Sequence, residues 1–213
     1  MFFFYYLFAF AVNAFDALHL DGIQRRKFYA TTLDGFEKIL SEEISCLPYV
    51  SAVRVGRCGV NFEGSVHTGL ASLMKLRTSL KILENIGECE DIYSSEDLYK
   101  FVRNQIDWTV MIDSSHTMKC DVTFGQNTNN QLSHSHFTAL TVKNAIVDQL
   151  RSVHDASRPS INLLDPDLSI LLYLHRNKGI LYRSWSGEES MHKRGYRQAI
   201  HKASLRETTA AGL

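Results

Sequence analysis

Hydrophobic and polar positions alternate with two different periods over residues 27 to about 90. Short runs with a period of two indicate β-strands, and between them apolar residues recur every three or four positions, as on one face of a helix. The signals come in the order β-α-β-β-α-β, which predicts a small ferredoxin-like unit. The strand signals lie at 28–31, 50–56, 60–62 and 77–89; the first helix carries Phe36, Ile39, Leu40, Ile44 and Leu47, and the second carries Leu70, Leu73 and Met74.

Local signals place the ends of these elements. Thr32 and Asp34 precede the first helix, and we expect one of them to cap it, because side-chain oxygens of this kind accept the free N–H groups of a first helical turn. The run Arg57-Cys58-Gly59 predicts a tight turn between the second and third strands.

A second series of strand and helix signals follows residue 90. The signals are a helix capped by Ser94 or Ser95, a strand at 118–124, a helix from about 135 to 153 with Phe137, Leu140, Val142, Ala145, Ile146 and Leu150 on its apolar face, a short strand at 161–163, and a hairpin of 168–174 and 179–185. In the hairpin turn we expect Asn177 and Gly179 to supply the positive φ angles. The fold class is therefore α+β, with two α/β units in tandem.

Residues 1–26 form an apolar leader that differs from the rest of the chain. The apolar run from Phe2 to Val12 is too short to cross a membrane as a helix. No Lys or Arg precedes it, although a secretory signal carries positive charge there. A signal or anchor and an extraneous leader both remain open, and we exclude the segment from fold reasoning. We expect a cytoplasmic or organellar protein (plastid or mitochondrion), without a stable membrane partner; a secreted or membrane-tethered interaction protein is the remaining alternative.

Charge is balanced overall but not locally. The chain has 23 Lys and Arg and 23 Asp and Glu, so its net charge gives no general attraction to nucleic acid. Between Arg176 and Arg206, however, eight basic residues stand against two acidic ones, Glu188 and Glu189. Such a cluster raises the local affinity for phosphate through counterion release.

Residues that would carry out chemistry are missing from the sequence. It contains no G-x-G-x-x-G, no G-x-x-x-x-G-K and no G-x-S-x-G, the motifs of nucleotide-binding folds and nucleophile elbows. Asp165 and Asp167 flank a proline and are interpreted as turn residues. His134 and His136 lack a third ligand, and the four cysteines form no C-x-x-C pair. We therefore predict no catalytic residue, no metal site and no cofactor site in this chain.

The remaining hypothesis is a surface that binds structured RNA. A polar loop at 125–136 leads into a predicted helix start, where free N–H groups and the helix dipole favour phosphate. Basic residues of the hairpin turn and of the segment after it extend this surface. The predicted RNA-binding residues are Asn127, Asn130, His134, Lys143, His175, Arg176, Lys178, Lys193, Arg194 and Arg197.

Three motifs carry a resemblance to a known family: LHRNKG at 174–179, SGEESMHKRGYR at 186–197 and LRETTAAGL at 205–213. Over residues 27–213 the sequence resembles the N-terminal half of bacterial-type large-subunit ribosomal RNA guanine-N2-methyltransferases. The resemblance implies a ferredoxin-like unit at 27–67 and a THUMP domain, an RNA-binding module, at 68–184. Residues 185–213 would be a linker and the first residues of a truncated Rossmann-like methyltransferase domain, which is absent.

The same resemblance implies partners and a cofactor. Structured RNA, most of all large-subunit ribosomal RNA, is the expected partner, together with a methyltransferase domain in cis in the full-length form. S-adenosylmethionine is expected for the full-length family and no cofactor for this chain, so whether the chain is itself an enzyme stays open. A THUMP protein directed to tRNA thiolation or methylation, and a non-catalytic stand-alone RNA-binding fragment, are the alternatives. Ser133 stands where the family usually has an Arg, which removes one expected phosphate contact.

Overall fold

The computed structural model describes residues 25–126, 132, 134–153, 158–195 and 204–213. Within them the chain forms two compact units. The first unit comprises the residues up to Ile82 together with Met191–Leu213, and the second unit comprises Leu83–Ser190. Of the predicted leader only Arg25 and Arg26 are described, and Arg26 already begins the first strand. No helix in the described part of the chain has both the length and the apolar character needed to cross a membrane.

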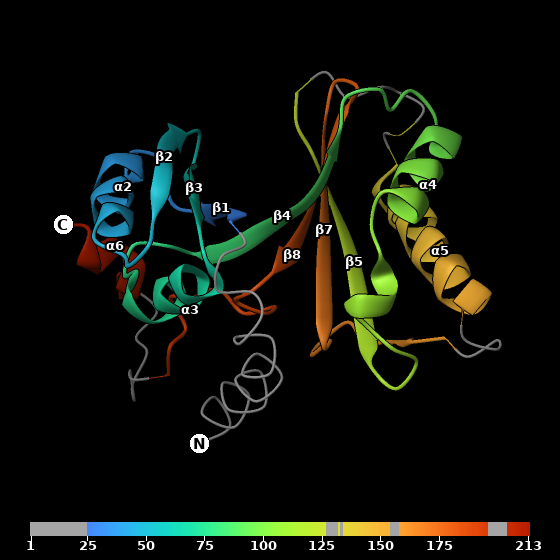
Figure 1. Ribbon diagram of the computed structural model, residues 1–213. Helices are drawn as coiled ribbons and strands as arrows, with labels where there is room; N and C mark the ends of the chain where they lie inside the picture. Colours follow the sequence, from blue (N-terminus) through green and yellow to red (C-terminus); the bar gives the residue numbers. More distant parts are fainter. Residues whose placement is uncertain (1–24, 127–131, 133, 154–157, 196–203) are drawn as a thin grey trace. The chain divides into compact units, whose positions relative to one another are not determined.

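The first unit has the predicted β-α-β-β-α-β order (Figure 1). Its elements are β1 (Arg26–Thr31), α2 (Glu37–Ser45), β2 (Ser51–Gly56), β3 (Gly59–Gly64), α3 (Val66–Lys75) and the beginning of β4 (Lys81–Cys89). The strands lie in the order β2-β3-β1-β4, and β3 pairs antiparallel with both β1 and β2. The prediction of a ferredoxin-like unit is confirmed.

Strand alternation decides which face of this sheet is buried. Phe28 lies opposite Phe62 and Ala30 opposite Val60, and all four are almost fully buried. The two phenylalanine rings stack with their centroids 5.2 Å apart, an arrangement that adds to the free energy gained from burying their area. Helix α2 contributes the fully buried Leu40 and Ile44. The core of the first unit therefore lies between this face and its helices.

The expected cap of the first helix is wrong. The residue at the N-cap of α2 is Phe36, which makes no side-chain cap. Thr32 is buried and donates its hydroxyl to the carbonyl of Thr78, 2.8 Å away, so it is used in packing. Glu37 accepts instead the backbone N–H of Gly35 at 2.8 Å. The helix therefore begins without a side-chain cap, and Glu37 in its first turn binds the residue before the N-cap position.

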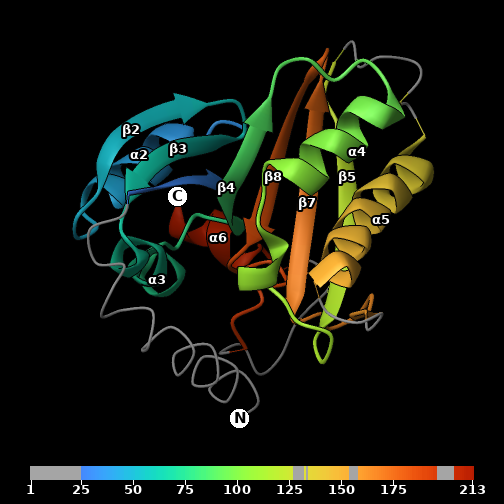
Figure 2. The same ribbon diagram turned by 45° about the vertical axis from the view of Figure 1, so that its right-hand side comes forward.

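The second unit is a five-stranded sheet in the order β4-β8-β7-β5-β6. Its elements after β4 are α4 (Ser95–Asn104), the short 3-10 helix η1 (Trp108–Val110), β5 (Thr117–Phe124), α5 (Ser135–Val153), β6 (Ser160–Ile161), β7 (Leu168–His175) and β8 (Lys178–Ser184). Strand β5 is parallel to β6 and β7, and β8 is antiparallel to β4 and β7. Helices α4 and α5 lie side by side over one face of the sheet (Figures 1 and 2).

The core of the second unit follows the alternation along β7. Ile170, Leu172 and Leu174 are buried under the helices, while Tyr173 and His175 point to the other face and are half-buried. Trp108 is fully buried and donates its indole N–H to the carbonyl of Val102 at 2.8 Å. The polar end of this large side chain thus has an acceptor inside the core, as burial requires.

Two expectations about the second unit are wrong in detail. Phe137 and Leu140 are 56% and 37% exposed, because the buried face of α5 begins at Thr138, whose hydroxyl donates to the carbonyl of Leu132. In the β7–β8 turn the positive φ angle belongs to Arg176, at 55°, and not to Asn177 or Gly179. His175 pairs directly with Lys178, so only Arg176 and Asn177 form the turn.

A buried carboxylate joins β4 to the end of β8. Glu84 is 5% exposed, and its Oε2 accepts hydrogen bonds from Arg183 Nε at 3.0 Å, Arg183 Nη2 at 2.6 Å and Trp185 Nε1 at 2.7 Å. The Arg183 guanidinium also lies over the Trp185 ring, 5.6 Å from its centroid. Both donors converge on one oxygen, so the charge of Glu84 is compensated where water is excluded.

The segment after β8 is fastened to both units in turn. Glu188 accepts hydrogen bonds from Lys119 Nζ, at 2.5 Å, and from the Ser169 hydroxyl, all within the second unit. Three residues further on, Met191 donates its N–H to the carbonyl of Leu80 in the first unit, at 2.8 Å. The change from one unit to the other thus occurs between these two anchors.

The unit boundaries differ from those expected at residues 67 and 184. Helix α3 stays in the first unit because it buries Val66, Thr68 and Ser72 there. At the other end of the chain, helix α6 (Glu207–Ala211) also belongs to the first unit. Its Thr208 is 2% exposed, and the Phe36 ring fills the space that a side chain at Gly212 would need.

The Glu84 contacts give a test of the second unit. In Glu84→Ala the Arg183 guanidinium and the Trp185 N–H lose their shared acceptor, and we expect unfolding of the second unit to become easier by about 3 kcal/mol. Glu84→Gln keeps an acceptor and should lose less. Urea unfolding followed by tryptophan fluorescence measures the effect, because both tryptophans, Trp108 and Trp185, lie in this unit. An unchanged urea midpoint in Glu84→Ala would contradict the assignment.

Candidate nucleic-acid interface

Several predicted RNA-binding residues lie at one end of the second unit. The end of β5, the β7–β8 turn and the beginning of α5 meet there (Figure 1). Gly125 donates its N–H to the carbonyl of Leu174 at 2.6 Å, which brings the start of the polar loop beside β7. His175 stacks on Tyr173 with ring centroids 6.5 Å apart. His134 is exposed, and its carbonyl accepts the N–H of Thr138 in the first turn of α5.

The basic residues at this end are unequally available. Arg176 is exposed at the tip of the turn. Lys178 forms ion pairs with Glu90 at 3.2 Å and Glu88 at 3.4 Å. The hydrogen bond to Glu90 and the charge of Glu88 raise the pKa of Lys178, although its partial burial acts in the opposite direction. Most of the positive charge of Lys178 is therefore compensated within the protein.

The other predicted residues of the second unit and its loop are scattered. Lys143 lies two turns along α5, half-buried, and its charge acts on the thiol of Cys120. Burial is the main influence on that thiol and raises the pKa of Cys120 to about 12. Asn127 and Asn130 lie outside the described residues, as does Arg197. The structure therefore brings together His175, Arg176 and Lys178 at the β7–β8 turn, whereas His134 and Lys143 belong to α5 and the residue before it.

Lys193 and Arg194 belong to the first unit. Lys193 is exposed. Arg194 donates from Nη2 to the carbonyl of Leu76 at 2.5 Å, from Nη1 to that of Met74 at 3.3 Å and from Nε to that of Met191 at 3.2 Å. Met74 and Leu76 stand at the end of α3, where unpaired carbonyls and the helix dipole favour a cation. The guanidinium of Arg194 thus fastens the returning chain to this helix.

Charge is divided between the two units. Residues 25–82 and 191–213 contain 14 Lys and Arg and 6 Asp and Glu, a net charge of +8. Residues 83–190 contain 9 Lys and Arg and 15 Asp and Glu, a net charge of −6. The sequence prediction missed this division because it counted basic residues across the unit boundary at residue 190. A phosphate backbone is attracted to the first unit and repelled by the average field of the second.

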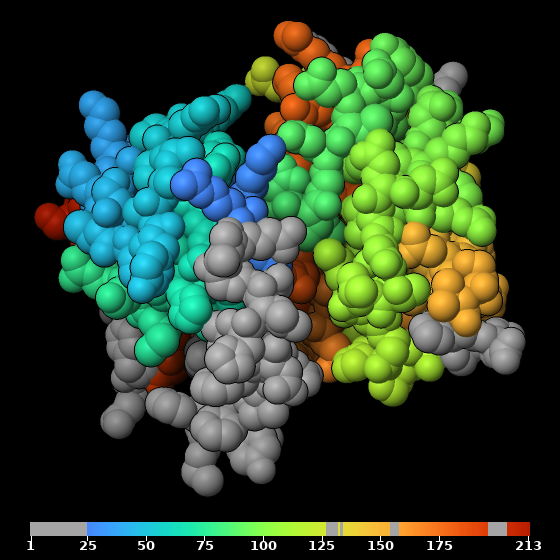
Figure 3. All heavy atoms as spheres, viewed as in Figure 1, coloured from blue at the N-terminus to red at the C-terminus, as the bar shows by residue number. Residues whose placement is uncertain are grey.

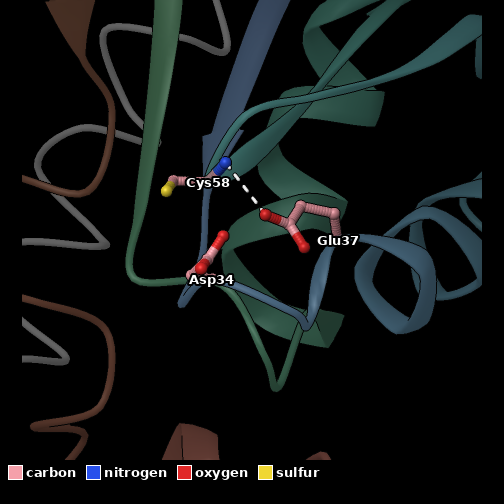
Figure 4. Close-up of side chains that lie close together, drawn as sticks. All are labelled: Asp34, Glu37 and Cys58. Atoms are coloured by element: carbon pink, nitrogen blue, oxygen red, sulfur yellow. Dashed lines mark hydrogen bonds between the residues drawn. The ribbon is translucent and has the colours of Figure 1, made fainter.

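Asp34, Glu37 and Cys58 form the group of potential metal ligands in the described part of the chain, with ligand atoms within 4.8 Å of one another (Figure 4). The Glu37 carboxylate accepts the backbone N–H of Cys58 at 3.0 Å and that of Gly35 at 2.8 Å. Hydrogen bonds from its own N–H and from these two residues lower the pKa of Glu37. The carboxylate therefore holds the start of α2 to the β2–β3 turn, and we assign it that structural role.

Comparison with protein families identifies both units. Residues 27–83 match the RlmL ferredoxin-like domain and residues 93–183 match the THUMP domain. The chain thus carries a THUMP domain preceded by a ferredoxin-like domain. It has these two domains in common with the N-terminal region of large-subunit ribosomal RNA methyltransferases, as the motifs at 174–213 indicated.

Individual relatives cover most of this chain but only part of their own length. The chain is 34% identical over 191 residues to the ribosomal RNA large subunit methyltransferase K/L of Desulfotalea psychrophila, covering 87% of this chain and 25% of that protein. It is 35% identical over 188 residues to a provisionally named RNA methyltransferase of Synechocystis, covering 88% of this chain and 47% of that protein. The chain thus spans a quarter to about half of these relatives.

The fold recurs in solved structures. The structure of SMU.472, provisionally a methyltransferase and solved with SAH, superposes with a TM-score of 0.75 at 22% identity, over 89% of this chain and 48% of that protein. At this identity the similarity establishes the fold.

Arg194 can be tested as a structural contact. Arg194→Lys keeps the charge but cannot reach three carbonyls at once, so we expect the first unit to lose about 1–2 kcal/mol of stability. RNA affinity should change less than twofold. Lys193→Gln, at the exposed neighbouring position, should leave stability unchanged. Thermal unfolding by circular dichroism and RNA titration separate the two effects; a large loss of RNA affinity without a loss of stability would contradict the structural role.

Thiol reactivity tests the surroundings of the cysteines. Cys46 is exposed, whereas burial keeps the Cys120 thiol protonated through its raised pKa of about 12. Because the thiolate is the reactive form, iodoacetamide at pH 8 should modify Cys46 first and Cys120 last in the folded protein. Peptide mass spectrometry over time measures the order, and unfolding in urea should abolish the difference. Early modification of Cys120 under native conditions would contradict the raised pKa of its thiol.

Proposed function

We propose that this chain is the RNA-binding part of a large-subunit ribosomal RNA methyltransferase. The observation that carries the proposal is the pair of domains in tandem, together with 34% identity over 87% of the chain to a relative named for that activity. The net charge of +8 over residues 25–82 and 191–213 supports contact with a phosphate backbone. Structured RNA is the proposed partner, and large-subunit ribosomal RNA the proposed target.

The chemistry of the proposed enzyme is methyl transfer from S-adenosylmethionine. SAH bound in SMU.472 supports this choice of cofactor. The residues of this chain bind and orient the RNA. They hold it so that a target guanine of the RNA reaches the cofactor, which is bound by a methyltransferase domain in cis. Such positioning lowers the entropic part of the barrier. The proposal places the protein in the cytoplasm or an organelle, where ribosomal RNA is made and modified.

The proposal predicts RNA binding that depends strongly on salt. The purified chain should bind a structured ribosomal RNA fragment, and with about four phosphate contacts its affinity should fall by about 100-fold between 50 and 200 mM salt. Fluorescence anisotropy with labelled RNA measures the dependence. An affinity that does not change with salt would contradict a phosphate-led interface.

The nature of the RNA is tested separately. Crosslinking in cells followed by sequencing should recover large-subunit ribosomal RNA. Recovery of tRNA instead would favour the alternative, a THUMP protein directed to tRNA thiolation or methylation.

A further inference from the structure

The sheet of the first unit has one face without a helix of the described chain over it. Alternation turns Phe28 and Ala30 of β1 toward the core, so Lys27 and Tyr29 belong to the opposite face. Register places Asn61 of β3 beside Tyr29, and Arg54 of β2 beside Asn61. In Figure 2, α2 lies behind the β2–β3 hairpin, which agrees with this assignment. We call the face formed by Lys27, Tyr29, Arg54 and Asn61, together with Arg57 in the adjoining β2–β3 turn, the open face.

Tyr29 is held in a defined position on the open face. Its ring lies against Gly59, where an added Cβ would come within 2.6 Å of it, and reaches Gly56, where the distance would be 3.9 Å. Its hydroxyl donates to the carbonyl of Arg57 at 2.8 Å. The side chain nevertheless stays partly exposed. The absence of a side chain at Gly59 thus lets an aromatic ring rest on the sheet, and little side-chain entropy remains to be lost when a ligand stacks on it.

Three basic residues lie on the open face or in the turn at its edge. Lys27, Arg54 and Arg57 are exposed, and the beginning of β1, dark blue, lies at the surface in Figure 3. Glu63 lies opposite Lys27 and is the acidic residue that the strand registers place on this face. The balance is positive, as in the first unit as a whole, whereas at the end of the second unit Glu88 and Glu90 compensate Lys178.

An aromatic ring on a central strand, with cations around it, has a definite binding chemistry. Unpaired bases stack on such rings, and Lys and Arg hold the adjoining phosphates; four-stranded sheets that bind RNA use this arrangement. A base in a duplex is already stacked and paired, so it is not available to the ring. The ligand that fits is therefore an unpaired nucleotide in a loop, a bulge or a single strand.

We infer that the open face binds an unpaired RNA nucleotide, whose base stacks on Tyr29 while Lys27, Arg54 and Arg57 contact its phosphates. The inference rests on the proposed function and names the part of the RNA that the ferredoxin-like unit recognises. The neighbouring position on β3 is Asn61 rather than a second aromatic residue, so one base stacks here. The Asn61 amide offers donors and an acceptor to the edge of that base.

The test uses a matched pair of substitutions at Tyr29 in the whole chain. Tyr29→Phe keeps the aromatic ring and loses the bond to Arg57, whereas Tyr29→Leu keeps apolar cover over the glycines and loses the ring. For a labelled RNA hairpin with an unpaired loop, Tyr29→Leu should weaken binding about tenfold, the contribution of one stacked base, and Tyr29→Phe less than twofold. For a blunt RNA duplex with the same stem, both should bind as the wild type does.

Two further measurements keep the inference testable if Tyr29→Leu does not fold. Arg54→Gln, at an exposed position of an edge strand, should reduce the slope of log affinity against log salt by about one contact. Photo-crosslinking of 5-iodouridine in the hairpin loop should modify the tryptic peptide 28–38, which contains Tyr29. The matched control is Arg151→Gln, at an exposed position of α5 in the second unit, which should leave the crosslink to this peptide in place.

The outcomes separate this inference from the proposed function. If the wild type binds hairpin RNA but Tyr29→Leu binds equally well and peptide 28–38 is not crosslinked, the open face is not the site, and RNA binding by the chain stands. If the wild type binds neither RNA, the proposed function itself fails. A crosslink to peptide 28–38 together with loss of loop binding in Tyr29→Leu supports both.

Discussion

The end of β8 and the residues that follow it depend on hydrogen bonds to the carboxylate of Glu84. A charge that is 5% exposed is stable only when donors surround it, and two of its donors come from Arg183 and Trp185, just before the connecting segment. This contact fixes where β8 ends beside β4. Glu188 then holds the next turn through Lys119 and Ser169. The segment after β8, from residue 185, is therefore ordered from its first residues, because buried polar groups are stable only when they form hydrogen bonds.

The same need for partners explains why a count of basic residues in a sequence overestimates how many of them are available to bind RNA. Between Arg176 and Arg206 eight cations suggested one continuous RNA-facing patch. Arg183 is committed to Glu84, Lys178 to two glutamates, and Arg194 to three carbonyls. Each forms contacts that a phosphate would have to replace, and breaking them costs free energy. The cations that interact with RNA most favourably are those whose structural role is smallest, such as exposed arginines on a sheet face.

The sequence predicted the fold well where burial alone decides it. The alternation of Phe28, Ala30, Val60 and Phe62, and that of β7, is a direct consequence of one sheet face being covered, so elements and their order were predictable. Details that depend on tertiary partners were not. Thr32 looked like a cap, but the carbonyl of Thr78 needed a donor inside the core. Arg176 takes the left-handed turn position because the register of β7 and β8 leaves only two residues for the turn.

The candidate site was less predictable than the fold because it depends on how charge is divided between units that the chain enters twice. The first unit is built from two separate stretches, so residues 191–213 add their charge to β1–α3 and not to the hairpin that precedes them in sequence. Only this grouping reveals a basic unit and an acidic one. On the proposed function, the first unit provides both attraction and recognition. Its net positive charge attracts the phosphates, and its open face provides a rigid ring for one unpaired base. On the proposed function, the net negative charge of the second unit disfavours nonspecific attachment along a duplex, because like charges repel at distances up to about 10 Å at moderate salt.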